Sequence, residues 1–149
     1  MITKKHTALV ALAACALTLA AVGSDKNPVT RPFRVQGSVT LTINLQDGAF
    51  TVEGTGVATH TGLFTAVGSG SISLTSHAAS GTSTGADGDA ITWVMPSLGT
   101  FVFTGGTGRF ANCSGGFNYV WQSAPAVSFP DATTELLTYS YIGVGQITY

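Results

Sequence analysis

The chain has 149 residues, enough for one domain with a modest core, and 44% of them are hydrophobic while only 9% are charged. This charged fraction lies far below the roughly 25% of ordinary soluble domains, which excludes a coiled coil, a charged disordered tail and a solvated helical bundle. The formal net charge of −1 excludes the basic surface that binds nucleic acid.

The first segment has the layout of a secretory signal peptide. Lys4 and Lys5 precede a run from Ala8 to Val22 that is apolar apart from Thr18, and a basic start followed by a short apolar core is typical of such leaders. The run is too short for a comfortable membrane span, which needs about 20 residues. Ala21 and Gly23 supply small side chains at the −3 and −1 positions, so we expect cleavage after Gly23.

Lipidation is a second interpretation of this segment. Leu12-Ala13-Ala14-Cys15 matches the bacterial lipobox, in which the cysteine carries the lipid. Apart from Thr18, the residues after Cys15 stay apolar, where a lipoprotein has a polar tether, so cleavage after Gly23 is favoured. We therefore expect an exported protein of the periplasm or the extracellular space, without a stable membrane span after leader removal. A lipid anchor through Cys15 is the alternative.

Removal of the leader changes the charge and the cysteine content. Six Lys and Arg residues less Lys4 and Lys5 leave four, against seven Asp and Glu, so the mature chain carries about −3. Cys15 is lost as well, and Cys113 then has no partner for an internal disulfide, even in an oxidising compartment. We expect Cys113 to be a buried thiol rather than a reactive one.

Strand-like alternation dominates the remainder of the chain. From Phe33 to Leu45 the odd positions are apolar or glycine and the even positions are polar, so one face is buried and the other is wet. Asp47-Gly48 follows as a hairpin signal, because glycine accepts the positive φ of the turn. We predict further strands over Phe50–Ala58, Phe64–Leu74, Ser80–Thr84, Ala90–Met95, Thr100–Thr104, Phe110–Trp121 and Glu135–Tyr149.

Turn residues separate these strands, and no helical periodicity follows the leader. The stretch 122–134, with Pro125 and Pro130, is predicted to be one long loop. Seven or eight antiparallel strands at this spacing indicate an all-β domain, a closed barrel of about eight strands, with a β-sandwich as the alternative. We predict a signal peptide at 1–23, a short linker at 24–31 and the barrel over 32–149.

Glycines recur on the inward face of two neighbouring predicted strands. Gly54 and Gly56 share a face with Phe50 on one strand, and Gly68 and Gly70 repeat the pattern on the next. A glycine inside a strand marks a bend or a close approach. We interpret these positions as places where a small barrel closes and large side chains fill the space opposite. Room for a ligand is the alternative.

An ordered series of motifs resembles a group of small exported bacterial proteins. It comprises Arg31-Pro32-Phe33, the segment Gly54–Thr65, Asp87-Gly88-Asp89 and the segment Phe103–Ala111, and the resemblance extends over most of residues 31–149. The Gly105-Gly106-Thr107-Gly108-Arg109-Phe110 segment is also similar to a hairpin of plant dirigent proteins and allene oxide cyclases. These families imply an eight-stranded, calycin-like antiparallel barrel, with carboxylate or arginine groups around the cavity in the plant proteins. The resemblance assigns no catalytic residue here.

Motifs of metal sites and common catalytic machinery are missing from the sequence. His60 and His77 are the only histidines after the leader and have no ligand spacing, so we expect no metal cofactor. Asp87-Gly88-Asp89 lacks the other ligands of a calcium loop. The glycine-rich segment Gly105–Arg109 lacks the lysine and the helix of a phosphate-binding loop. Gly81-Thr82-Ser83-Thr84-Gly85 matches the letters of the G-x-S-x-G pattern, but no helical periodicity follows it, so it is no nucleophile elbow.

Six residues are candidates for ligand binding: His60, Phe64, Arg109, Phe117, Tyr119 and Trp121. His60 would face inward, although pairing with a hydroxyl or a backbone group is the favoured interpretation. Arg109 could hold an acidic ligand, but pairing with Glu53 or a hairpin aspartate is favoured. The aromatic residues lie on inward faces, where they belong either to the core or to a cavity lining.

Three classes of function fit these observations. The first is an exported barrel that binds a small apolar or aromatic ligand or serves as a structural module of the cell envelope. The second is a cyclase- or dirigent-like enzyme, which needs an ionisable group inside the barrel. The third is a small outer-membrane barrel, suggested by the aromatic last strand, although glycines and hydroxyls interrupt the apolar band that it needs. The scarcity of catalytic groups favours the first class.

Overall fold

The computed structural model describes residues 27–73 and 76–149 of the chain. The predicted signal peptide and Cys15 lie outside the described residues. In chain order the elements are β1 (Thr30–Asn44), β2 (Ala49–Ala58), β3 (Gly62–Ile72), β4 (His77–Gly85), β5 (Ala90–Ser97), β6 (Thr100–Gly106), the 3₁₀ helix η1 (Gly108–Phe110), β7 (Ser114–Trp121), β8 (Ala126–Asp131) and β9 (Thr134–Thr148). Thr30, which we assign to the linker, is thus already part of the first strand.

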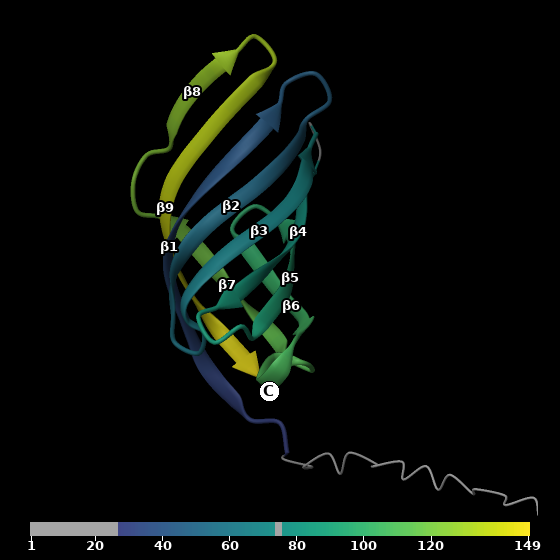
Figure 1. Cartoon of the computed structure of the whole chain (residues 1–149), viewed down its shortest axis with the longest axis vertical. Helices are drawn as coiled ribbons and strands as arrows, with labels where there is room; N and C mark the ends of the chain where they lie inside the picture. Colours follow the sequence, from purple (N-terminus) through teal and green to yellow (C-terminus); the bar gives the residue numbers. More distant parts are fainter. Residues whose placement is uncertain (1–26, 74–75) are drawn as a thin grey trace, which may run out of the picture.

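Eight of the strands form a closed antiparallel barrel (Figure 1). Strands β1 to β6 each pair with the strand that follows them in the chain, and β9 closes the barrel by pairing with both β7 and β1. The β1–β9 ladder runs without interruption from Thr30 opposite Thr148 to Asn44 opposite Thr134. The predicted all-β closed barrel is confirmed. In the described part of the chain, no helix has the length and apolar character of a membrane span.

Strand β8 corrects the predicted long loop over residues 122–134. It pairs with the first residues of β9, while β7 pairs with β9 from Tyr141 to Thr148. All six residues of β8 are exposed, and within residues 27–73 and 76–149 no strand lies beside its outer edge. Pro130 argued for a loop, but proline is tolerated on an edge strand because one side of that strand needs no ladder hydrogen bonds. Figure 1 shows β8 and the start of β9 projecting beyond β5 to β7.

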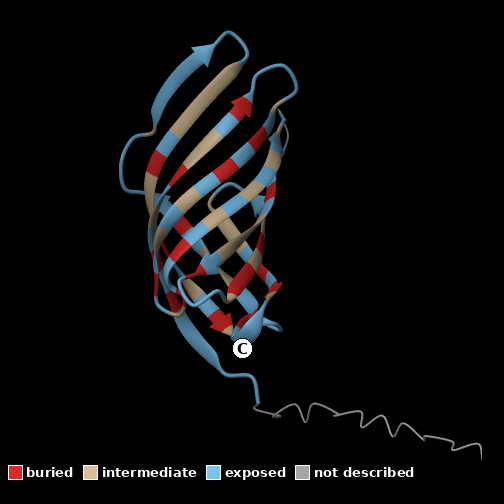
Figure 2. Cartoon of the chain, in the orientation of Figure 1, coloured by how far each residue is buried: buried red, intermediate tan, exposed pale blue. Residues whose placement is uncertain are grey.

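The predicted alternation is seen directly in the burial of the strands (Figure 2). In β1, Phe33, Val35 and Val39 are buried, and the residues between them face outward or are only partly covered. Outward positions carry hydroxyls: Thr40 on β1 bonds Thr138 on β9 between side-chain oxygens 3.0 Å apart. The barrel is thus apolar inside, as a period of two requires, while its outer face combines hydroxyls with exposed apolar side chains such as Val67 and Val144.

Large aromatic rings occupy the space left by most of the inward glycines. A Cβ added at Gly56 would lie 2.8 Å from Cζ of Phe64, and one at Gly68 would lie 2.8 Å from Cη2 of Trp93. Gly54 differs, because its nearest side-chain atoms belong to Val39 at 3.6 Å and it lines open interior space. The interpretation that these glycines make room for packed side chains is confirmed at Gly56 and Gly68, and at Gly70, where an added Cβ would meet the Phe50 ring.

The end of the barrel that holds the C-terminus, here called the closed end, is tightly packed. Helix η1 carries Phe110, which has no exposed surface and meets the Tyr149 ring edge-on with centroids 5.1 Å apart, and Ile147 is fully buried as well. Phe110, which we predict as the first residue of a strand, lies instead in this short helix. Gly108 at its start has a φ of +54° and lies against the Asp89 carboxylate, so only a residue without a side chain fits there.

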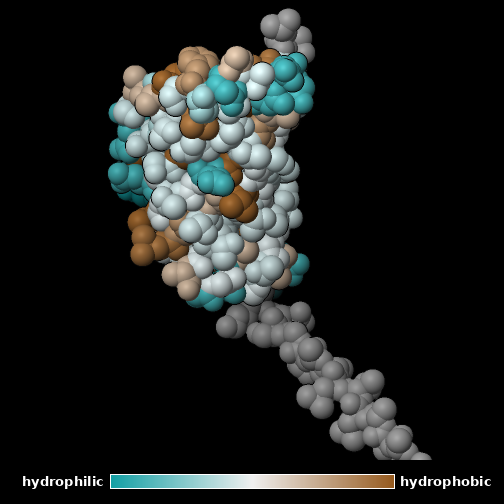
Figure 3. Space-filling model, turned by 45° about the horizontal axis from the view of Figure 1, so that its top comes forward, coloured by the Kyte–Doolittle hydropathy of each residue, from teal (hydrophilic) through white to brown (hydrophobic). Residues whose placement is uncertain are grey.

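The opposite end of the barrel, here called the open end, exposes large apolar side chains. Leu45, Leu98, Trp121 and Phe129 lie on the turns and strand ends at this end, each with about half or more of its surface exposed. Figure 3 turns this end toward the reader and shows apolar patches between hydrophilic and nearly neutral surface. The barrel therefore has one sealed end and one end where its interior can be reached.

Candidate ligand-binding cavity

The barrel encloses an apolar cavity of about 90 Å³. Its lining comes from all eight barrel strands and reaches the open end, where His77 and Leu98 are exposed. One water molecule needs roughly 10–15 Å³ of such space, so the cavity has room for several water-sized groups. Sites for drug-sized ligands start at about 300 Å³. The cavity therefore suits a molecule of about one ring.

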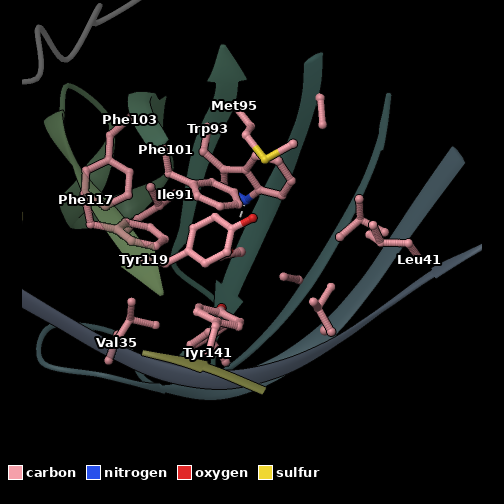
Figure 4. Close-up of a pocket in the computed structure, with 18 of the residues that line it drawn as sticks. Val35, Leu41, Ile91, Trp93, Met95, Phe101, Phe103, Phe117, Tyr119 and Tyr141 are labelled. Carbon is pink, nitrogen blue, oxygen red and sulfur yellow. Dashed lines mark hydrogen bonds between the residues drawn. The ribbon is translucent and has the colours of Figure 1, made fainter. Parts of the chain in front are cut away.

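Two chemically different walls face each other across the cavity (Figure 4). Strands β5, β6, β7 and β9 contribute the larger rings, among them Trp93, Phe101 and Tyr119. Strands β1 to β4 contribute mainly aliphatic or small residues such as Leu41 and Ala66, and β1, β2 and β3 each add one phenylalanine: Phe33, Phe50 and Phe64. Figure 4 shows Leu41 on the side away from the labelled aromatic side chains. A ligand would therefore lie between an aromatic surface and an aliphatic one.

The aromatic wall is a chain of ring contacts. Phe101 and Phe117 are stacked, with centroids 4.8 Å apart and planes 3° from parallel. The Trp93 ring meets Phe101 edge-on at 4.9 Å, and Tyr119 lies 5.7 Å from Phe101. Each ring restrains its neighbours, because offset and edge-on arrangements of this kind are favourable. The wall is preformed without any ligand.

Three tyrosines line the cavity, and burial raises the pKa of the two that lie on β9. Tyr119 is 8% exposed, and its buried hydroxyl has no hydrogen-bond partner. Burial raises the pKa of Tyr141 to about 12, with a further contribution from Tyr119. Burial raises the pKa of Tyr139 further still, and the nearby Tyr119 phenol adds to this shift. The two phenols interact electrostatically, but their hydroxyls do not meet the geometry of a hydrogen bond, so Tyr119 stays unpaired.

The other polar groups of the lining are already bonded or lie at the mouth. Ser83 Oγ accepts a hydrogen bond from Trp93 Nε1 at 3.1 Å. The Thr61 hydroxyl donates to the Gly62 carbonyl at 3.4 Å. Among the described lining residues there is no aspartate, glutamate, lysine or arginine, and the one histidine, His77, is exposed. The cavity thus carries no fixed charge.

His60 lies at the closed end and does not line the cavity. Its Nε2 lies 2.8 Å from the Pro32 carbonyl oxygen and its Nδ1 lies 3.2 Å from the Tyr149 hydroxyl. The Pro32 carbonyl can only accept, so His60 Nε2 donates to it. The predicted pairing with a hydroxyl and a backbone group is confirmed, and His60 joins β1 to the end of the chain.

Arg109 also lies at the closed end, on η1. Its Nη2 is 2.6 Å from Asp87 Oδ2 and 3.0 Å from the His60 carbonyl oxygen, and its Nε is 3.7 Å from Asp89 Oδ2. Of the two predicted partners, Glu53 and a hairpin aspartate, the structure selects the aspartate. The guanidinium therefore clamps the Asp87 hairpin to the β2–β3 turn outside the cavity.

The structure brings together three of the six predicted ligand-binding residues. Phe64, Phe117 and Tyr119 line the cavity. Trp121 lies next to Tyr139 near the open end, with ring centroids 5.7 Å apart, and is half exposed. The prediction omitted the rest of the aromatic wall and the two tyrosines of β9. The inward direction of these omitted side chains could have been predicted, because polar and apolar residues alternate in the predicted strands over 90–95, 100–104 and 135–149.

Cys113 is buried, as predicted. Its thiol donates to the Gly105 carbonyl at 3.1 Å, and burial raises the pKa of the thiol. A raised pKa disfavours the reactive thiolate. Among the described residues, no group of three His, Cys, Asp or Glu side chains is placed to hold a metal ion.

Comparison of the chain with models of protein families, with curated proteins and with solved structures gives no match. The structure agrees with the calycin-like resemblance at the level of the architecture, a closed eight-stranded antiparallel barrel. The site must therefore be interpreted from its own geometry and chemistry.

Proposed function

We propose that the protein is a binding module that holds a small apolar molecule inside its barrel. The observation that carries this proposal is the apolar cavity of about 90 Å³, which lies inside the barrel and reaches the exposed residues His77 and Leu98 at the open end. A cavity with an apolar lining and a few polar groups is the usual form of a small-molecule site. With the predicted leader, this module would act outside the cytoplasm.

The cavity chemistry favours binding over catalysis. The resemblance to allene oxide cyclases and dirigent proteins would call for a carboxylate or arginine group at the ligand, but the described lining carries neither. The pKa values of Tyr139 and Tyr141 are raised by burial, so these phenols do not exchange protons readily near neutral pH. Arg109 and its aspartates lie outside the cavity and bind each other.

Calorimetric titration with toluene, a small neutral probe, tests the proposal. Ala66 lines the cavity, whereas the adjacent Val67 faces outward and is 60% exposed. We expect saturable binding by the natural protein, a loss of at least about tenfold in Ala66→Leu, where the longer side chain fills the cavity, and unchanged binding in Val67→Leu. Circular dichroism would establish that both variants fold. Absence of binding, or equal binding by folded Ala66→Leu, would contradict the proposal.

A further inference from the structure

The Tyr119 hydroxyl is the one buried side-chain polar atom without a partner among the described residues. Leaving such a group unpaired is unfavourable, and an exception of this kind in a folded protein calls for an explanation. Tyr119 is more than nine-tenths buried and lines the cavity. Figure 4 shows its ring pointing into the space between the aromatic side chains and Leu41.

The groups around Tyr119 do not supply the missing hydrogen bond. The Ser83 hydroxyl is engaged with Trp93, and the Thr61 hydroxyl with a backbone carbonyl. Tyr139 interacts with Tyr119 without hydrogen-bond geometry. The Tyr119 hydroxyl therefore has no partner in the described protein, and a molecule in the cavity could form a hydrogen bond with it.

The rest of the lining limits the class of molecule that can enter. A charged group would lose its hydration without meeting an opposite charge, because the described lining holds no charged side chain, and such a transfer is very unfavourable. The stacked and edge-on rings of Phe101, Phe117 and Trp93 offer a surface on which a flat ring packs well. A phenol oxygen donates more readily than it accepts, because its lone pair is shared with the ring.

We propose that the cavity takes a small, uncharged aromatic compound that carries a carbonyl-type oxygen, and that the Tyr119 hydroxyl donates a hydrogen bond to this oxygen. This inference rests on the proposed function and adds to it the class of ligand and a residue that determines specificity. The aromatic wall then packs against the ring of the ligand, and Tyr119 sets its orientation.

Two probes of nearly the same shape separate this inference from the proposed function. Acetophenone carries a carbonyl oxygen where α-methylstyrene carries a methylene group. We expect the natural protein to bind acetophenone about fivefold to tenfold more tightly than α-methylstyrene, as one net hydrogen bond implies. If α-methylstyrene binds and acetophenone binds no better, this inference fails while the proposed function stands. If neither binds, both fail.

The variant Tyr119→Phe removes the hydroxyl and keeps the ring. We expect it to lose most of the preference for acetophenone, roughly fivefold to tenfold, while its affinity for α-methylstyrene is unchanged or higher. Tyr149→Phe is the matched control, because its hydroxyl bonds His60 at the closed end, and it should keep the preference. An unchanged preference in folded Tyr119→Phe, or an equal loss in Tyr149→Phe, would overturn the inference.

Discussion

The Trp93 indole on β5 lies against the backbone of Gly68 on β3, where a Cβ would stand only 2.8 Å from Cη2 of the ring. On β4, between these strands, Gly81 is in the same kind of close contact with the indole. The indole is anchored by the hydrogen bond from its Nε1 to Ser83. The Trp93 ring of the aromatic wall thus occupies space that is free only because residues 68 and 81 are glycines.

We expect Gly68→Ala to destabilise the barrel by about 1–3 kcal/mol, because the added methyl forces the indole or the strand to move. The measurement is the free energy of unfolding by urea. Ser80→Ala is the control, since Ser80 lies beside Gly81 but faces outward and is exposed, and it should change stability by no more than about 0.5 kcal/mol. A stability of Gly68→Ala equal to that of the control would show that the contact is not needed.

Replacing Phe110 by alanine tests the packing of the closed end, and the same replacement at the exposed Phe129 is the control. Phe110 has no exposed surface, whereas Phe129 on the edge strand β8 is 62% exposed. We expect Phe110→Ala to cost about 3–5 kcal/mol, since it leaves a cavity in the sealed end. Phe129→Ala should cost at most about 0.5 kcal/mol. Similar losses in the two variants, measured by denaturant unfolding, would refute this account of how the barrel is sealed.

The Arg109–Asp87 ion pair should contribute little to stability. The two side chains are 44% and 43% exposed, and exposed pairs are worth at most about 1 kcal/mol. Asp87→Asn removes the charge and keeps the oxygen that accepts from the Asp89 amide. We expect a loss below about 1 kcal/mol that shrinks at 1 M salt, where the screening length is about 3 Å. A larger loss of stability, independent of salt, would mean that Asp87 stabilises the protein through an interaction other than this ion pair.

Strongly alkaline pH should destabilise the protein through the tyrosines of β9. The pKa of Tyr141 is raised from its ordinary value near 10 to about 12, and that of Tyr139 is raised further. The unfolded chain therefore releases these protons at lower pH than the folded chain, so stability is intact below pH 10 and falls as pH rises through about 12. Each group contributes a slope of about 1.4 kcal/mol per pH unit in that window.

Unfolding measured between pH 9 and pH 12 tests this, with Tyr141→Phe as the informative variant. Its decline in stability should be shallower than that of the natural protein. Near-ultraviolet absorbance should show Tyr141 ionising only above its ordinary range. A decline of equal steepness in the two proteins would contradict the assignment.

The barrel was predictable because its strands alternate cleanly. The odd positions from Phe33 to Leu45 predicted a buried face, and Phe33, Val35 and Val39 are buried in the structure. Strand β8 was not predicted, because Pro125 and Pro130 indicate a loop and β8 has no buried face to produce alternation. Strands whose residues are all exposed carry no hydrophobic signal.

Only part of the site was predictable. Alternation shows whether a side chain points into the barrel, but it does not show how far along the barrel axis that side chain lies. Phe117, Tyr119 and Trp121 share one face of β7, but only the first two reach the cavity, since Trp121 lies where β7 ends near the open end. His60 and Phe64 are close in sequence, yet the β2–β3 turn places His60 at the closed end. The unpaired Tyr119 hydroxyl depends on three-dimensional packing that no local pattern records.

The most direct test of the central claim maps acetophenone binding on the protein by nuclear magnetic resonance of methyl groups. The account predicts saturable shifts of the inward methyls of Val39, Val52 and Ile91, which line the cavity. The methyls of Val57 and Val144, which are 54% and 66% exposed, should stay unchanged. An absence of saturable shifts, or shifts confined to the outward methyls, would contradict the claim that the barrel interior is a ligand site.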